Sequence, residues 1–278
     1  MLAVDYLVIG HITQDLTPDG PAPGGTAAYA ALTAQAMGVS AGIVTSYGPD
    51  ARLGAVAGVP TACVPAETNT TFENESKPVG RRRQHVRGLA RPLNLSTIPP
   101  SWRSARIVHL GPVAQEVDPE LAGQFPRSLV CLTPQGWLRR WESGGLVLPG
   151  AWPGAEETLR KAGAAVFSLE DVQGDEETVE EYANTCPIVA VTEGSRGARV
   201  YWNTHLRRFS APALAELDST GAGDIFAAAF FIRLHETRDP YEAGRFATLL
   251  ASASVTRRGL EGVPTFSEIA AARIEVLL

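Results

Sequence analysis

Six short segments of the chain are apolar almost without interruption and are rich in β-branched residues. Continuous apolar character, rather than strict alternation, is typical of strands that are covered on both faces of a sheet. We therefore expect these segments to form the interior of a mainly parallel sheet. They are residues 6–12, 41–48, 106–113, 128–134, 164–170 and 188–194.

Segments with a helical pattern lie between these strands and after them. In the first, "GTAAYAALTAQAMG", Thr26 is placed to cap the start of the helix and Gly38 to end it. Strands that alternate with helices predict βαβ units, so we expect a three-layer α/β fold in which a mainly parallel sheet is flanked by helices. The other expected helices are residues 156–162, 176–185, 225–234, 241–256 and 266–277.

Residues 68–94 interrupt this alternation. Their sequence, "TNTTFENESKPVGRRRQHVRGLARPLN", is polar and has no helical period. It predicts two polar strands around a turn at residues 78–80. Such a hairpin does not fit a parallel core, so we expect it to protrude and to pair with part of residues 13–23. The whole chain, 1–278, is therefore expected to be a single domain that includes a small β-lid, formed by about 13–23 and 68–94.

Composition narrows the class of protein. The 278 residues are 45% hydrophobic and 19% charged, enough for a sizeable core, and the net charge of −6 argues against a protein that neutralises nucleic-acid phosphates. Three widely spaced cysteines suit neither a disulfide framework nor a zinc site. The start "MLAVDYLVIG" does not read as a signal peptide, and the longest apolar run, 225–232, is too short to cross a bilayer. We expect a cytoplasmic protein that binds neither nucleic acid nor membrane.

The stretch "DSTGAGD" at residues 218–224 carries the candidate chemistry. It lies directly ahead of a predicted helix, whose first N–H groups have no internal partners and whose dipole leaves that end partly positive. With Gly221, Ala222 and Gly223 there, an anion of phosphate size can reach the amides. Asp224 would repel a phosphate, but it makes sense as a base that accepts a proton from an attacking hydroxyl. Asp218 is expected to stabilise the turn; the alternative to this chemistry is a glycine-rich helix entry with two capping carboxylates.

These residues also carry a resemblance to a known family. "DSTGAGD" resembles the D-T-x-G-A-G-D signature of the ribokinase-like, or PfkB, family of carbohydrate and nucleoside kinases, with Ser219 in place of the usual threonine. "PGGTAAYAALTAQAMG" is similar to the family's substrate-pocket helix, "VIGHITQD" to its first strand and "VTEGSRGA" to its hairpin beside the nucleotide. The resemblance covers almost the whole chain.

The resemblance implies transfer of the γ-phosphoryl group of ATP to a hydroxyl of a small acceptor, with Mg²⁺ as cofactor. It implies that Asp224 and the amides of 221–223 are catalytic, and that Asp15, Gly24 and Gly25 orient the acceptor. The residues it places beside the nucleotide are Thr192, Gly194, Gly197, Gly221, Gly223 and Gly259. Lys77 and Lys161 are the only lysines of the chain, so phosphate charge would be met by amides, Mg²⁺ and arginine. Arg139 and Arg140 could clamp the transferred phosphate, but we expect them to face solvent.

The chain departs from the family pattern at two places. Tyr29 replaces the asparagine that usually follows the second glycine by four residues, and S-x-x-D at 168–171 replaces the N-x-x-E motif that is associated with Mg²⁺. Asp171 would then hold the metal, with Glu170 as a rival. These two departures and "TPQGWLRRW" look most like the myo-inositol kinase-like branch. Tyr29 offers an apolar face and a hydroxyl, which would suit a cyclic polyol but equally suits packing.

We therefore expect an ATP-dependent kinase of a sugar or cyclic polyol similar to myo-inositol, with a homodimer formed through the lid as a further expectation. One alternative is a nucleoside kinase of the same family, which would need an aromatic residue near the lid, where Phe72 is the only candidate. Another is a catalytically silent nucleotide- or sugar-binding regulator. The intact "GAGD" argues against silence, whereas the altered N-x-x-E motif favours it.

Overall fold

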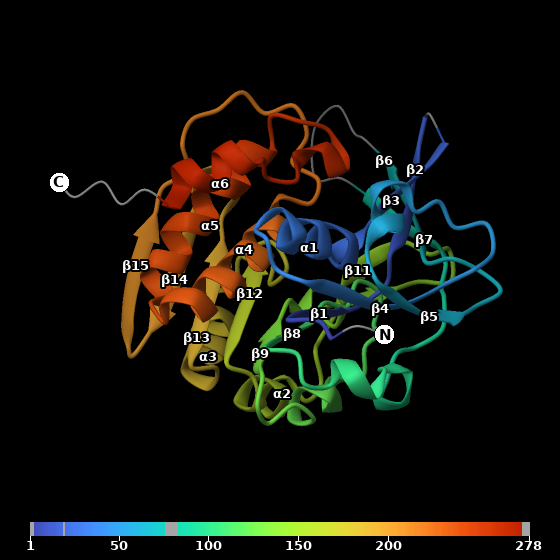
Figure 1. Cartoon of the computed structure of the whole chain (residues 1–278), viewed down its shortest axis with the longest axis horizontal. Coiled ribbons are helices and arrows are strands. Elements are labelled where there is room, and N and C mark those ends of the chain that lie inside the picture. The colour runs from blue at the N-terminus through green and yellow to red at the C-terminus, as the bar shows by residue number, and fades with distance from the viewer. Residues whose placement is uncertain (1–2, 19, 76–82, 274–278) are drawn as a thin grey trace.

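The computed structural model describes residues 3–18, 20–75 and 83–273. Within these residues, nine strands form one large sheet in the order β15-β14-β13-β12-β9-β8-β1-β4-β5, and helices cover both of its faces (Figure 1). The strands are β1 (Tyr6–Ile9), β4 (Ala41–Tyr47), β5 (Thr61–Pro65), β8 (Ile107–Leu110), β9 (Leu129–Leu132), β12 (Ala164–Ser168), β13 (Ile188–Thr192), β14 (Ala198–Trp202) and β15 (His205–Phe209).

The strands predicted from continuous apolar runs all lie in the parallel part of this sheet. Each is shorter than its predicted segment, and neighbours from β5 across to β13 pair in parallel. The apolar pattern did not predict β5, β14 or β15, although the family resemblance placed a hairpin at the turn between β13 and β14, where the sheet becomes antiparallel. β15 is mostly exposed, so it lacks the apolar run that identified the others.

Both faces of the parallel strands are buried, which explains their apolar character. Leu7 packs in a core beneath α2 and α3, whereas its neighbour Val8 packs in the opposite core beneath α1, α4, α5 and α6. This is the three-layer α/β arrangement predicted from the sequence, and Figure 1 shows the helices on either side of the sheet. The helices are α1 (Gly25–Ala36), α2 (Ala155–Lys161), α3 (Glu176–Thr185), α4 (Ala222–Thr237), α5 (Pro240–Ser254) and α6 (Phe266–Arg273).

The start of α4 and the cap of α1 differ from the prediction. α4 begins at Ala222, within the glycine-rich stretch, and not at residue 225. Thr26 does not cap α1, because the N-cap position is Gly24 and no side chain bonds the free amides there. The predicted end of the last helix, beyond 273, lies outside the described residues.

Short 3₁₀ turns occupy Gly54–Gly58, Leu95–Thr97, Pro100–Trp102, Pro119–Gly123, Pro134–Gly136, Gly194–Arg196 and Gly259–Gly262.

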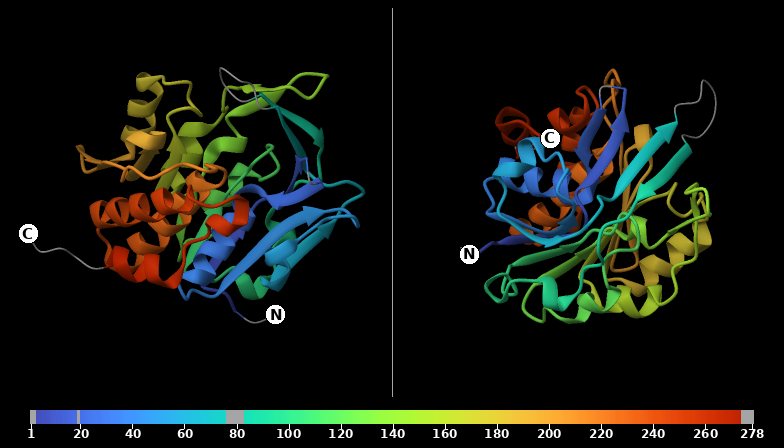
Figure 2. Two further views of the ribbon diagram at one scale, coloured as in Figure 1. Left: turned by 90° about the horizontal axis from the view of Figure 1, so that it is seen from above. Right: turned by 90° about the vertical axis from the view of Figure 1, so that its right-hand side faces the viewer.

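A second, smaller sheet stands beside the main one, at the upper right in Figure 1 and apart from it in Figure 2. In the described part of the chain its order is β3-β2-β6-β7, with β2 parallel to β6 and the other pairs antiparallel. The bounds are β2 (Thr13–Thr17), β3 (Gly20–Gly24), β6 (Thr71–Glu75) and β7 (Arg83–Gly88). The predicted turn at 78–80 lies outside the described residues. A hairpin of β10 (Arg139–Trp141) and β11 (Val147–Pro149) adjoins β7 through a bridge from His85 to Leu146.

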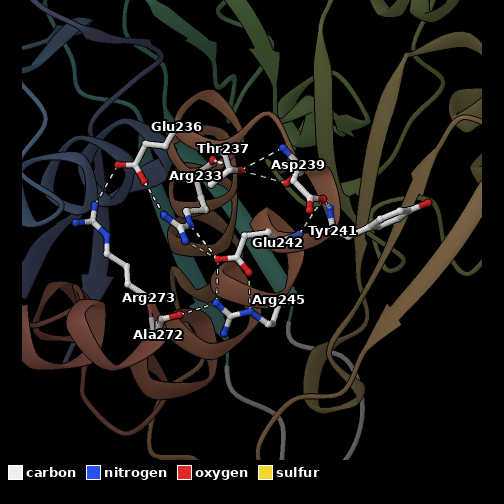
Figure 3. Close-up of polar contacts among 9 residues, drawn as sticks. All are labelled: Arg233, Glu236, Thr237, Asp239, Tyr241, Glu242, Arg245, Ala272 and Arg273. Carbon is white, nitrogen blue, oxygen red and sulfur yellow. Dashed lines mark hydrogen bonds and ion pairs between the residues drawn. The ribbon is translucent and has the colours of Figure 1, made fainter. Parts of the chain in front are cut away.

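Ion pairs join the last three helices (Figure 3). Glu242 of α5 accepts hydrogen bonds from Arg233 of α4 and from Arg245, and its side chain is only 11% exposed. Arg273 of α6 reaches Glu236 at 3.0 Å. Burial alone would raise the pKa of Glu242, but the hydrogen bonds from the two arginines outweigh it and lower that pKa.

Among the described helices, none is long and apolar enough to span a membrane.

Candidate active site

A cavity of about 840 Å³ lies where the second sheet, the first turns of α1 and α4, and the ends of β12 and β13 meet. The sequence-predicted site residues that line it come from all of these elements. They are Asp15, Gly25, Tyr29, Glu170, Asp171, Thr192, Gly194, Gly197, Gly221, Ala222, Gly223 and Asp224. Gly24 and Gly259 are not among its lining residues.

The glycine-rich stretch forms the N-terminal end of α4. Gly221 has a φ of +79°, and a Cβ on it would overlap the ring of Tyr29, so only glycine fits the turn. At Gly223, by contrast, a Cβ would meet nothing within 4 Å. The amides of this turn therefore border open space at the positive end of a long buried helix. That is the arrangement an anion needs.

Asp218 stabilises this turn, as its sequence position predicted. Its Oδ1 accepts from the N–H of Thr220, and its Oδ2 accepts from the N–H of Gly259 at 2.9 Å. Gly259 therefore supports the loop from behind, and a role beside the nucleotide stays a prediction.

Asp224 lies two residues into α4, and its carboxylate faces the cavity. Thr26 donates a hydrogen bond from Oγ1 to its Oδ1 at 2.6 Å. Burial raises the pKa of Asp224 from 3.8 to about 6, although the Thr26 hydroxyl and the Arg139 guanidinium both act to lower it; Asp171 and Asp15 add to the rise. A carboxylate with this pKa is ionised at neutral pH and still basic enough to accept a proton.

Two glycines at the start of α1, Gly24 at the N-cap and Gly25 as the first helical residue, allow the helix to approach β2 closely. A Cβ on Gly24 would lie 2.6 Å from Oδ2 of Asp15, and one on Gly25, whose φ is +81°, would lie 2.7 Å from the carbonyl oxygen of His11. Thr13 donates to Oδ1 of Asp15 at 3.1 Å. This contact orients the Asp15 carboxylate beside the first turn of α1.

Tyr29 is 2% exposed, and its ring packs behind the glycine-rich turn at Gly221. Sequence analysis assigned it to the acceptor. The structure places its ring between α1 and the turn at Gly221, so its direct contact with an acceptor stays a prediction.

Asp171 follows β12 and is held by two hydrogen bonds. Its Oδ2 accepts from the N–H of Ser168 at 2.9 Å, and its Oδ1 accepts from Nε2 of Gln135 at 3.2 Å. Burial raises its pKa above the usual value. Glu170 is exposed at the cavity rim. Residues 3–18, 20–75 and 83–273 contain no group of three or more aspartate, glutamate, histidine or cysteine side chains that could hold a metal ion.

The turn between β13 and β14 borders the other side of the cavity. Gly197 has a φ of +96°, and a Cβ there would overlap the carbonyl oxygen of Phe209. Thr192 and Gly194 line the cavity beside it. Apolar side chains continue this wall, namely Ala211, Pro212, Ala213, Leu214, Ala251 and Val255.

Sequence reasoning missed a buried chain of hydrogen bonds that ends at the cavity. Tyr6 Oη lies 2.8 Å from Nδ1 of His109, and Nε2 of His109 lies 2.9 Å from Oγ1 of Thr133, which lines the cavity. Burial lowers the pKa of His109 to about 3, so the ring is neutral. The local pattern showed a histidine within an apolar strand, but not its partners.

The expectation that Arg139 faces solvent is wrong. Arg139 lines the cavity, whereas Arg140 is exposed and its Nε donates to the carbonyl of Pro149. Successive strand residues point to opposite faces, so a strand at β10 would have indicated that only one of the two arginines faces solvent.

Comparison with known proteins agrees with this architecture. Residues 156–265 match the model of the pfkB family carbohydrate kinases. A cytidine kinase of Thermococcus kodakarensis is 27% identical over 82% of this chain and 87% of its own length. A putative sugar kinase of Pyrococcus horikoshii is 31% identical over 42% of this chain, which spans only 41% of that protein.

Solved structures share the whole fold. A pyrophosphate-dependent kinase in the ribokinase family, complexed with a pyrophosphate analog and myo-inositol, superposes with a TM-score of 0.81 over 96% of this chain and 99% of its own, at 19% identity. Arabidopsis thaliana ribokinase, complexed with ribose and ATP, superposes with a TM-score of 0.72 over 99% of this chain and 100% of its own, also at 19% identity. Residues 156–265 thus resemble the pfkB family carbohydrate kinases, a cytidine kinase is similar over most of the chain, and the fold is that of ribokinase-family structures.

Proposed function

We propose that this protein transfers the γ-phosphoryl group of ATP to a hydroxyl of a small polyol or sugar, with myo-inositol as the favoured acceptor. The observation that carries the proposal is the position of Asp224. Its carboxylate faces a cavity of substrate size, directly beside helix-terminal amides that border open space. A base and an anion-binding turn side by side are what phosphoryl transfer to a hydroxyl requires.

In this reaction Asp224 accepts the proton of the acceptor hydroxyl as its oxygen bonds to the γ-phosphorus. The bond from that phosphorus to the bridging oxygen breaks, and ADP leaves with the electron pair. The amides at 221–224 stabilise the negative charge that spreads over the transferring group. The smaller sheet, which contributes Asp15 and Phe72 to the cavity wall, excludes water that would otherwise hydrolyse ATP.

The residues around Asp171 fit a magnesium ion. Mg²⁺ is usually bound by one or two carboxylates together with water and substrate phosphates, so a cluster of protein ligands is not needed. Asp171 accepts one hydrogen bond on each oxygen, which leaves lone pairs for a metal-bound water, and Glu170 lies at the rim. The ion would neutralise charge on the transferring phosphoryl group.

The donor side favours a nucleotide. The wall from Ala211 to Leu214, with Ala251 and Val255, gives an apolar surface that suits a purine base. A pyrophosphate donor, as in the structural neighbour described above, would leave this wall without an occupant. The same acceptor offered with ATP and with pyrophosphate separates the two donors.

The acceptor side supports a polyol better than a nucleoside. Phe72 is the aromatic residue that a nucleobase would stack on, but it is 3% exposed, and the Arg139 guanidinium lies 5.8 Å from its ring centroid. The similarity to a cytidine kinase keeps a nucleoside acceptor as the second candidate. A silent regulator is disfavoured, because Asp224 retains a hydrogen-bond partner that orients it.

The test is ATP consumption measured over a panel of myo-inositol, hexoses, ribose and nucleosides, with product phosphorylation verified by mass spectrometry. We expect the highest kcat/KM with myo-inositol or a related cyclic polyol. Higher kcat/KM with ribose or cytidine would replace the inositol assignment and keep the kinase. ATP bound without turnover of any acceptor would favour the regulator.

We also propose a cytoplasmic homodimer that pairs through the smaller sheet. Within the described residues the outer strand β3 has a neighbouring strand on one side only, whereas β7 also bridges to Leu146, and a free strand edge can pair with another chain. The three cysteines are free, as in a reducing compartment. Light scattering would show twice the chain mass, and cell fractionation tests the location.

A further inference from the structure

Arg139 is the only cationic side chain among the described residues that line the cavity. The acidic side chains that line it are Asp15, Glu170, Asp171, Glu216 and Asp224. Burial lowers the pKa of Arg139, while the carboxylates of Asp171, Asp224, Glu116 and Asp15 act against this effect. A buried cation is costly unless charges or hydrogen bonds compensate it, so its position inside a substrate-sized cavity calls for a function.

The local structure fixes where this guanidinium lies. Nη1 of Arg139 donates to the carbonyl of Val113 at 3.1 Å, and the guanidinium lies over the ring of Phe72. This carbonyl is its single hydrogen-bond acceptor among residues 3–18, 20–75 and 83–273. A guanidinium has five N–H donors, so most of those on Arg139 are not used by Val113. The nitrogens of Arg139 are not among the fully buried polar atoms that lack a hydrogen-bond partner. The remaining donors therefore open onto the cavity.

Phe72 links Arg139 to the acceptor side of the cavity. Phe72 of β6 is the register partner of Asp15 of β2, in a parallel pair. Side chains of directly paired residues lie on the same face of a sheet, and all three residues line the cavity. The Asp15 carboxylate, which only accepts hydrogen bonds, and the Arg139 guanidinium, which only donates them, thus lie on either side of the Phe72 ring.

We propose that Arg139 binds the acceptor substrate, donating to hydroxyl oxygens of a polyol whose neighbouring hydroxyls donate to Asp15. Each hydroxyl can both donate and accept, so adjacent hydroxyls of one ring can satisfy both residues at once. A nucleobase has no comparable use for this site, because the guanidinium already covers the ring it would stack on. This inference rests on the proposed function and specifies which residue selects the polyol.

The adjacent arginine provides a matched control. Arg139→Met removes the donors and keeps an unbranched apolar side chain, Arg139→Lys keeps the charge without the planar fork, and Arg140→Met makes the same chemical change on the exposed face of β10. Kinetics are measured for each variant with myo-inositol and its monodeoxy analogues, with circular dichroism to verify folding.

For Arg139→Met we expect KM for myo-inositol to rise about ten- to hundredfold, the usual cost of a lost hydrogen bond from a charged donor, with KM for ATP nearly unchanged. Arg139→Lys should recover part of this loss, and Arg140→Met should match the wild type. For at least one monodeoxy analogue, removal of the hydroxyl should lower kcat/KM much less in Arg139→Met than in the wild-type enzyme. The hydroxyl and the arginine donor form the same contact, so losing both costs little more than losing one.

A second measurement separates binding from a structural role. Arg139 lowers the pKa of Asp224, which Asp171 and Asp15 raise and the Thr26 hydroxyl lowers, so the acid limb of kcat/KM should move to higher pH in Arg139→Met. A fall in kcat with KM for myo-inositol unchanged would overturn the proposal, since the guanidinium would then serve the transferring phosphoryl group. So would wild-type kinetics in folded Arg139→Met and Arg139→Lys. Failure of the proposed function looks different, because the wild-type enzyme itself would then not phosphorylate a polyol.

Discussion

Thr26 and Asp224 are 198 residues apart in the chain, yet the hydroxyl of Thr26 donates to Oδ1 of Asp224 over 2.6 Å. The bond joins the first turn of α1 to the first turn of α4. It holds the carboxylate toward the cavity and stabilises its ionised form, against burial that favours the protonated form. Much of the proposed chemistry depends on this contact.

Asp224→Asn should lower kcat by about 10² to 10⁴, the usual contribution of a general base. ATP binding should hold or tighten slightly, because a negative charge beside the phosphates is removed. Steady-state kinetics and calorimetry test both effects. Asp239→Asn is the control, since Asp239 caps α5 outside the cavity and asparagine caps about as well as aspartate. A folded Asp224→Asn enzyme that keeps more than about a tenth of wild-type kcat would contradict the catalytic assignment.

The same aspartate should make stability depend on pH. Its pKa is about 6 in the folded protein and 3.8 in its usual state, so the folded protein binds the proton more tightly. The resulting stabilisation is complete below pH 3.8 and is lost as the pH rises through about 6. The stability of Asp224→Asn relative to the wild type, measured as the free energy of denaturant unfolding, should therefore be higher at pH 7 than at pH 4. An identical difference at both pH values would mean that Asp224 is not desolvated.

Thr26→Val keeps the shape of the side chain but removes the donor to Asp224. The pKa of Asp224 should rise further, by about one unit or more, as expected for a lost hydrogen bond to a charged group. The acid limb of kcat/KM should then move to higher pH, and activity lost at pH 7 should partly return at pH 9. Thr26→Ser keeps the hydroxyl and should show the wild-type profile. If the profiles of Thr26→Val and Thr26→Ser coincide, the hydrogen bond does not tune the base.

Gly223→Val should weaken ATP binding by about tenfold or more, because the new side chain fills the space in which phosphate meets the amides. Folding should survive, since a Cβ at Gly223 meets nothing within 4 Å. Gly58→Val is a matched control, because Gly58 is equally open but lies outside the cavity. Calorimetry with ATP decides the matter, and unchanged affinity in folded Gly223→Val would mean that the anion site is misplaced.

Glu242→Gln should destabilise the protein by about 1.5–3 kcal/mol, the usual range for hydrogen bonds to a charged group, because Arg233 and Arg245 lose their shared carboxylate. The pKa of Glu242 is lowered, so its contribution is present above its usual 4.5 and is lost as the pH falls through its folded value. Glu157→Gln breaks an exposed pair with Lys161 and should change stability little. Equal effects of the two substitutions in thermal unfolding would contradict a special role for Glu242.

The sequence was informative wherever a local pattern has one physical cause. Continuous apolar runs marked the strands that are buried on both faces, and the glycine-rich stretch marked the turn at the start of α4 that lines the cavity, where only glycine fits at Gly221. That backbone amides and arginine meet phosphate charge stays a prediction.

Other features depend on partners that are distant in the chain. A threonine in the first turn of α1 looks like a cap unless the position of Asp224 is known. The direction of Arg139 depends on the parity of a three-residue strand, β10, which is too short to be recognised by alternation. β15 is mostly exposed and β14 includes the charged Arg199, so neither has the continuous apolar run of the parallel strands.

The first turns of α1 contact both halves of the site. Gly24 abuts Asp15, Thr26 holds Asp224 and Tyr29 packs against Gly221. A small shift of this helix caused by an acceptor therefore reaches the anion-binding turn without any intermediary. By thermodynamic reciprocity, the factor by which the acceptor changes the affinity for ATP equals the factor by which ATP changes the affinity for the acceptor. If that factor favours binding, ATP is held weakly while the acceptor is absent, which limits its wasteful hydrolysis.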